Sequence, residues 1–253
     1  MTMLTAIPTV RFARGHLRII DQTLLPGRYE IVALGTLDGV CDAIQRLRVR
    51  GAPAIGVAGA YGLLVAVEEA FGRSSGPVFD SGIDDAGNDR AAKLDMPAGI
   101  DVASLKTTLD RAAERIVATR PTAVNLSWAV ERMRGVWLNQ DDAHDICRRL
   151  IAEADAILRE DLALGRVMTS HGAALLNDGD TVLTHCNTGG LATGGIGTAL
   201  GVVFAAAAAG KHVRVFADET RPLLQGARLT AWECRERGVP VTVLVDGAAA
   251  SLL

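Results

Sequence analysis

A glycine-rich loop that begins with a cysteine is the part of this sequence best suited to chemistry. The segment Thr184-His185-Cys186-Asn187-Thr188-Gly189-Gly190 follows an apolar run at 181–184 and precedes an apolar helix expected over 197–209. Ligands bind at the carboxyl ends of strands in open α/β folds. A thiol beside glycine backbone amides could therefore act on a small anionic substrate. The alternative is that Cys186 is a small buried apolar residue, as most free cysteines are.

The second candidate is Arg50-Gly51-Ala52-Pro53, where an arginine directly precedes a glycine-led helix start. Backbone amides at a helix N-terminus and a guanidinium could converge on one phosphate. The alternative is an ordinary helix start with a solvated arginine. The chain has no GxxxxGK[ST] pattern, and the glycines after Cys186 do not form GxGxxG. A nicotinamide-dependent dehydrogenase is therefore disfavoured.

A third cluster of charged residues runs from Asp218 to Arg228, after the strand expected over 213–217. Its position indicates the wall of a site, and the alternative is that its acidic residues cap the following helix. His185 precedes Cys186, but neighbours on a strand point to opposite faces, which argues against a Cys–His pair. Because no histidine has metal-ligand spacing, we expect no metal site.

Composition narrows the class of protein. The 253 residues suffice for one large domain or two modest ones, and a net charge of −3 indicates neither a nucleic-acid nor a membrane partner. The four cysteines are scattered without a CxxC pair, which indicates free thiols in a reducing compartment. The N-terminus has no apolar signal core, and the apolar segments are short or carry repeated glycines. We therefore expect a cytoplasmic protein.

The periodicity of apolar residues predicts the elements that hold these candidates. Residues 1–34 are expected to form short strands and turns, and residues 72–100, rich in Gly, Ser, Asp and Pro, a mobile surface loop. The spacing predicts helices over 36–49, 54–71, 102–119, 122–137 and 142–164. Strands at 181–185, 213–217 and 241–245 alternate with helices at 197–209 and 222–237, which is the pattern of a parallel sheet.

The expected fold class is α/β. A small α-rich N-terminal domain with short strands, residues 1–125, precedes a Rossmann-like parallel-sheet domain, residues 126–253, that includes a long linking helix. After the last expected strand only Gly247 to Leu253 remain, which is too short for a crossover and a return strand. We therefore expect the parallel sheet to be incomplete.

Five segments together resemble the methylthioribose-1-phosphate isomerase family of methionine salvage, over nearly the whole chain apart from 72–100. They are Asp21–Pro26, Val49–Gly56, Arg120–Leu126, Thr184–Gly201 and Glu219–Glu233. The wider superfamily includes regulatory subunits of the exchange factor for translation initiation factor two and ribose-1,5-bisphosphate isomerases. The intact Cys186 motif with Gln225 is similar to the enzymes rather than to the regulatory subunits.

The resemblance implies conversion of 5-methylthioribose 1-phosphate into 5-methylthioribulose 1-phosphate by a homodimer without a cofactor. It places Cys186 at the reacting carbons, and it assigns phosphate and hydroxyl binding to Arg50, Gly51, Ala52, Arg120 and Gln225. Ring opening precedes hydrogen transfer from C2 to C1, either as a proton or as a hydride. Three alternatives stay open: 5-deoxyribose 1-phosphate or ribose 1,5-bisphosphate as the substrate, and a non-catalytic regulatory protein.

The sequence departs from this family in one respect. The family's catalytic aspartate, in a Gly-Ala-Asp-Arg-Ile segment, and its Asn-Lys substrate contact have no counterpart here, and Asp246 matches an earlier aspartate. We therefore expect the chain as written to bind sugar phosphate poorly and to be catalytically weak or inactive.

Overall fold

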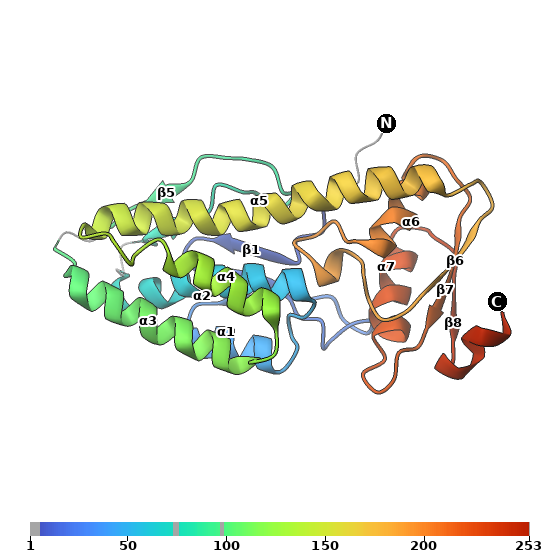
Figure 1. Ribbon diagram of the computed structural model, residues 1–253, viewed down its shortest axis with the longest axis horizontal. Coiled ribbons are helices and arrows are strands. Elements are labelled where there is room, and N and C mark those ends of the chain that lie inside the picture. Colours follow the sequence, from blue (N-terminus) through green and yellow to red (C-terminus); the bar gives the residue numbers. More distant parts are fainter. Residues whose placement is uncertain (1–5, 73–75, 97–98, 253) are drawn as a thin grey trace.

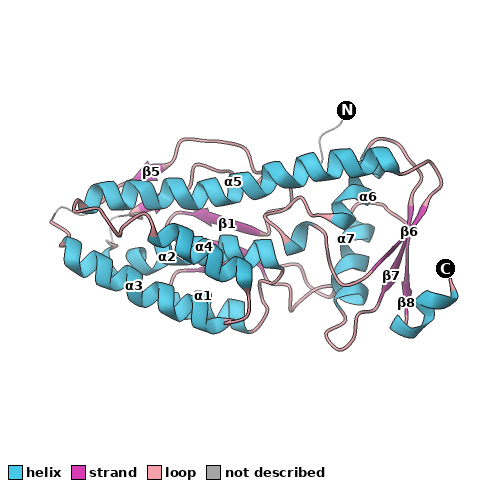
Figure 2. Cartoon of the chain, in the orientation of Figure 1, coloured by secondary structure: helices cyan, strands magenta, loops and turns pink. Residues whose placement is uncertain are grey.

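The computed structural model describes residues 6–72, 76–96 and 99–252. One long helix, α5 (Ala143–Leu175), runs along two groups of elements and links them (Figure 1). Helices dominate the first group, and a small parallel sheet lies in the second (Figure 2). This arrangement confirms the expected α/β fold class, whereas the division into domains at residues 125 and 126 stays a prediction.

The first group combines a three-stranded antiparallel sheet with four helices. The sheet has the order β1-β2-β3, formed by Val10–Ala13, His16–Ile20 and Ile31–Leu34. The helices are α1 (Leu37–Gln45), α2 (Ala52–Phe71), α3 (Val102–Thr119) and α4 (Val124–Arg134). Thr36 caps α1 by accepting a hydrogen bond from the Gly39 amide at 3.1 Å, which confirms the predicted start of that helix.

Helix α2 is the centre of this group and contacts α1, α3, α4 and α5. It is apolar around its circumference, as expected of a helix covered on all sides. Its 20 residues are long and apolar enough to cross a bilayer by length and composition, and α2 is one of the apolar segments that carry repeated glycines. However, 78% of its most apolar window is buried inside the protein, as in a core helix.

Residues 72–100 are less irregular than predicted. Two short strands, β4 (Phe79–Asp80) and β5 (Lys93–Leu94), pair antiparallel. Phe79 and Ile83 are buried, so the interpretation of this segment as a surface loop was wrong for these residues. Within the segment, residues 73–75 and 97–98 lie outside the described residues.

A buried carboxylate connects this segment to the helices. Asp155 of α5 accepts hydrogen bonds from the Tyr61 hydroxyl at 2.8 Å, the Ser81 hydroxyl at 2.7 Å and the Gly82 amide at 2.6 Å. Asp155 is only 3% exposed. Because a buried carboxylate is stable only when donors surround it, these bonds fix the segment to α2 and α5.

The Tyr61→Phe variant is expected to lose about 1–3 kcal/mol of unfolding free energy, because it removes one donor from a buried carboxylate. Chemical unfolding followed by circular dichroism measures the loss. Tyr29→Phe is the matched control, since Tyr29 is 49% exposed and stacks on Trp232. Equal losses in both variants would show that the Tyr61 hydroxyl contributes nothing specific.

Helix α5 continues eleven residues beyond its predicted end at residue 164, to Leu175. Gly165 and Gly172 weaken the helical pattern in this region, but Gly172 lies where α5 packs on the apolar helix α6 (Ala199–Ala208), and Gly165 lies against Ile196 just before α6. A Cβ atom at Gly165 would lie 2.9 Å from Ile196, and one at Gly172 would overlap Val202. The two glycines therefore allow close helix packing, which outweighs their low helix propensity.

The second group contains the predicted parallel sheet. Its strands have the order β6-β7-β8, formed by Thr181–Thr184, Arg214–Asp218 and Val241–Leu244. A short 3₁₀ turn at Asp246–Ser251 follows β8. The helix expected over 222–237 is shorter, with a π-helical turn at Gly226–Thr230 leading into α7 (Ala231–Glu236). The parallel register places the ends of the three strands at one edge, directly before the Cys186 loop and the 218–230 segment.

Candidate functional site

The two strongest sequence candidates meet in space. Nη2 of Arg50 lies 3.6 Å from Sγ of Cys186, although the residues are 136 positions apart in the chain. Arg50 and Gly51 directly precede α2, and Cys186 follows β6. The thiol, the guanidinium and the N-terminus of α2 therefore share one site, and Cys186 is half-buried rather than part of the core.

Gly51 explains how the helix start approaches the Cys186 loop. It has φ +98°, and a Cβ atom there would overlap the backbone of Ala192, which lies in the 3₁₀ turn Gly190–Ala192 of that loop. Only a residue without a side chain permits this contact and this backbone conformation. Ala52 is the first residue of α2, so its amide is among those without a partner inside the helix.

Two polar atoms among the predicted site residues lack hydrogen-bond partners within the described part of the chain. They are Nη1 of Arg50 and Oε1 of Gln225, and both are buried. An unpaired buried polar atom costs about 1–3 kcal/mol, so a ligand with phosphate or hydroxyl oxygens would relieve this cost. Arg120 is different: it caps the C-terminus of α3, and among the described residues no hydrogen bond or ion pair joins its side chain to Arg50 or Cys186.

A buried glutamate, which sequence reasoning gave no role, organises the Cys186 loop. Glu233 of α7 is 1% exposed and accepts hydrogen bonds from Asn187 Nδ2 and the Gly190 amide, both at 2.8 Å. Burial raises the pKa of the Glu233 carboxyl, and this effect outweighs the hydrogen bond from Asn187 and the charge of Arg237. In the sequence, Glu233 stood out only as the last residue of the resembling segment Glu219–Glu233, with no role attached to it.

The raised pKa of Glu233 predicts a pH-dependent contribution to stability. An acid whose folded-state pKa is raised stabilises the fold below its unfolded pKa and loses this contribution as pH rises through the folded pKa. As pH rises above the ordinary pKa of a glutamate, we therefore expect the unfolding free energy of Glu233→Gln to increase relative to that of the unmodified protein. Unfolding midpoints across this range measure the change.

The control for this prediction is Glu236→Gln, the same substitution at an exposed position of the same helix. This control shows the effect of removing a carboxylate of α7 that is not buried. Parallel pH curves for Glu233→Gln and Glu236→Gln would contradict the proposed role of burial at Glu233.

His185, Asp218 and Asp246 also lie together, each at the last residue of a different parallel strand or within two residues after it. One potential metal-ligating atom from each falls within 4.8 Å of the others, a grouping that sequence spacing did not reveal. His185 Nδ1 contacts Asp218 Oδ2 at 3.0 Å, so the structure pairs His185 with Asp218 rather than with Cys186. Both Asp246 oxygens accept backbone hydrogen bonds, from the amides of Thr220 and Arg221. These bonds assign Asp246 a structural role, and the absence of a metal site stays a prediction.

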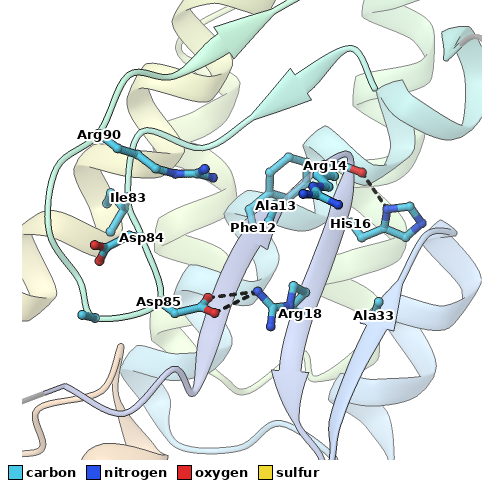
Figure 3. Close-up of a pocket in the computed structure, with 11 residues that line it drawn as sticks. Phe12, Ala13, Arg14, His16, Arg18, Ala33, Ile83, Asp84, Asp85 and Arg90 are labelled. Atoms are coloured by element: carbon cyan, nitrogen blue, oxygen red, sulfur yellow. Dashed lines mark hydrogen bonds and ion pairs between the residues drawn. The ribbon is translucent and has the colours of Figure 1, made fainter. Parts of the chain in front are cut away.

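A separate cavity of about 830 Å³ lies between strands β1 and β2 and the 83–90 segment (Figure 3). Several of its charged side chains are already paired: Arg18 with Asp85 at 3.0 Å, and Arg90 with Asp80 at 2.7 Å. No predicted site residue lines this cavity. The site at Cys186 is therefore the stronger candidate for chemistry.

The sequence is similar to those of several curated proteins. The chain is 45% identical to a protein of Albidiferax ferrireducens named methylthioribose-1-phosphate isomerase, over 98% of this chain and 63% of that protein. It is 42% identical to a protein of Moorella thermoacetica named 5-deoxyribose 1-phosphate isomerase, over 99% of this chain and 64% of that protein. The chain thus spans less than two thirds of the length of these curated relatives.

Solved structures agree on the fold. The structure is similar to the crystal structure of 5-methylthioribose 1-phosphate isomerase from Pyrococcus horikoshii, with a TM-score of 0.79, 34% identity, and coverage of 97% of this chain and 62% of that one. It is also similar to that of translation initiation factor eIF-2B, subunit delta, from A. fulgidus, with a TM-score of 0.77, 40% identity, and coverage of 95% and 63%.

The model of the initiation factor 2 subunit family matches residues 48–253, which include the Arg50 segment, the Cys186 loop and the parallel sheet. This match covers most of the chain and every predicted site residue. The chain therefore belongs to the initiation factor 2 subunit family.

Proposed function

We propose that this chain carries the thiol and phosphate-binding parts of an aldose–ketose isomerase active site, with 5-methylthioribose 1-phosphate as its substrate. The observation that carries the proposal is the contact between the Arg50 guanidinium and the Cys186 thiol at the N-terminus of α2. The thiol stands beside a cationic group and free backbone amides, which is a suitable environment for a phosphorylated sugar.

In this proposal the phosphate binds Arg50 and the amides of Gly51 and Ala52. A phosphate on the anomeric carbon leaves no free aldehyde, so the ring must open first, with the C1–O4 bond breaking and O4 taking a proton. One hydrogen then moves from C2 to C1, and the C2 hydroxyl loses its proton to become the ketone. Cys186 lies at these carbons, and the immobilised phosphate lowers the barrier by orienting them.

Arg120 and Gln225 stay proposed contacts of the sugar phosphate. The unpaired buried Oε1 of Gln225 supports a hydrogen bond with a sugar hydroxyl. The names of the relatives support the methylthio substrate and, as a second candidate, 5-deoxyribose 1-phosphate. Ribose 1,5-bisphosphate, a homodimer and a cytoplasmic location also stay predictions.

Binding and turnover should be measured separately. Isothermal titration calorimetry with 5-methylthioribose 1-phosphate, 5-deoxyribose 1-phosphate and ribose 1,5-bisphosphate measures affinity, and ³¹P NMR detects conversion of each aldose phosphate into its ketose. We expect the methylthio sugar to bind most tightly.

Ketose formation would support the complete proposal. Binding without turnover would support the phosphate site and agree with the expectation that the chain as written is catalytically weak or inactive. Absence of binding by all three sugars would overturn the proposal and favour a non-catalytic regulatory protein.

A further inference from the structure

Cys186 adopts a backbone conformation that few residues with side chains accept. Its φ is +63°, in the left-handed region, and Thr220 in the adjacent segment also has φ +63°. For a β-branched residue such as threonine this conformation is a genuine outlier. Such strain persists only where the surrounding structure over-determines it, and it concentrates at functional sites.

Two threonine hydroxyls hold the backbone of Cys186. The Cys186 amide donates a hydrogen bond to Thr220 Oγ1 at 2.8 Å, and the Thr230 hydroxyl donates one to the Cys186 carbonyl at 2.6 Å. Thr220 and Thr230 are 6% and 1% exposed. The backbone amide and carbonyl of Cys186 are therefore both hydrogen-bonded to side chains rather than within secondary structure.

Asp246 in turn fixes Thr220. Its Oδ1 accepts a hydrogen bond from the Thr220 amide at 2.7 Å, and its Oδ2 accepts one from the Arg221 amide at 2.8 Å. These backbone donors lower the pKa of the Asp246 carboxyl. The Thr220 hydroxyl completes the arrangement by donating to the Asp218 carbonyl at 3.1 Å. The segments after β8, β7 and β6 are thus connected in that order, ending at Cys186.

The location of Thr230 depends on a close contact within the same segment. Gly226, in the π-helical turn that ends at Thr230, lies against the Asp218 carbonyl, and a Cβ atom there would overlap it. Any larger residue would push this turn away from β7. The turn therefore presents the Thr230 hydroxyl to the Cys186 carbonyl, opposite to Thr220.

We propose that Thr220 and Thr230, with Asp246 behind Thr220, are positioning residues that hold Cys186 in the left-handed conformation and so direct its thiol toward Arg50. An extended conformation at Cys186 would point its side chain in another direction, because successive side chains of a strand alternate. The role in isomerisation rests on the proposed function, whereas the hold on the Cys186 backbone does not.

Hydrogen exchange of the Cys186 amide tests the backbone part without any substrate. With ¹⁵N-cysteine labelling the chain has four cysteine amides, and the signal of Cys186 is identified by its loss in Cys186→Ser. We expect Thr220→Val to accelerate exchange of this amide about tenfold, the equivalent of one net hydrogen bond. Thr220→Ser keeps a hydroxyl and should restore protection. Thr169→Val is the matched control, since the Thr169 hydroxyl bonds within α5.

Single-turnover kinetics test the role of Thr220 in the chemistry. In single-turnover experiments Thr220→Val should slow isomerisation about tenfold or more, with the dissociation constant of the sugar phosphate within about threefold. In a Cys186→Ala background the same substitution should have little further effect, because it acts through the thiol.

The outcomes separate the two proposals. Unchanged exchange of the Cys186 amide in Thr220→Val, or equal acceleration in Thr169→Val, would overturn the positioning role. Faster exchange in Thr220→Val that Thr220→Ser reverses would establish the hold on the backbone even where no ketose forms, and then the proposed function alone would fail. If Thr220→Val does not fold, Thr230→Val tests the carbonyl side: it releases the Cys186 carbonyl and should also accelerate exchange of the Cys186 amide, and unchanged exchange would overturn the positioning role.

Discussion

Replacing Cys186 by alanine is expected to slow isomerisation of the bound sugar phosphate by about 10²–10⁴-fold, the usual contribution of a positioned group that handles protons. Its thiol lies 3.6 Å from the Arg50 guanidinium, where the proposed substrate places its reacting carbons. Binding should change little, because Arg50 and the amides of α2 hold the phosphate. Single-turnover kinetics with the protein in excess detect even slow chemistry and separate this step from binding.

Cys41→Ala is the matched control for this variant. Cys41 is also partly buried, but it lies in α1 and is not one of the predicted site residues, so its removal should leave the rate within about twofold. An unchanged rate in Cys186→Ala would show that the thiol does not act on the substrate. A large loss of binding in the same variant would instead indicate that Cys186 maintains the shape of the loop.

Replacing Arg50 by methionine is expected to weaken sugar phosphate binding by about 2–4 kcal/mol, which corresponds to about 30–1000-fold in the dissociation constant. The substitution keeps a long side chain but removes the guanidinium, and with it the buried Nη1 that has no partner among the described residues. Isothermal titration calorimetry with the preferred sugar phosphate measures the loss. The rate of the bound complex should fall as well, because the phosphate is no longer oriented.

Two further variants show whether the planar geometry of the guanidinium or its positive charge is responsible for the loss of affinity. Arg50→Lys keeps the positive charge without the planar fork, so its affinity should lie between those of Arg50→Met and the unmodified protein. Arg46→Met removes a 75% exposed arginine side chain that pairs with Asp42, and should change affinity less than about twofold. Equal losses in Arg46→Met and Arg50→Met would reduce the role of Arg50 to general electrostatic attraction.

Local sequence patterns were sufficient for most elements. The predicted helix at 102–119 matches α3 at both ends, and β6, β7 and β8 lie within one residue of the predicted strands. These predictions succeeded because the periodicity of apolar residues reflects which face of an element is buried. The end of α5 was missed because its glycines serve packing against α6, which is a tertiary contact.

The site was only partly predictable for a related reason. Cys186 and Arg50 carry reactive or charged groups beside glycines, so their residue types identified them. Thr220 and Thr230 carry no such signal, since their importance arises from hydrogen bonds to a strained peptide unit 34 and 44 positions away. Arg120 was included through resemblance, and its contact with a ligand stays a prediction.

The sequence by itself determined the α/β class, the alternation of strands and helices in the parallel sheet, and the two segments whose residues could do chemistry. Each of these depends on residues that are neighbours in the chain. Only the tertiary structure decided that these segments form one site. Gly51 allows the start of α2 to lie against Ala192, and threonine hydroxyls fix the Cys186 backbone nearby. Such contacts join residues far apart in the chain, and packing of the complete core, rather than local preference, selects them.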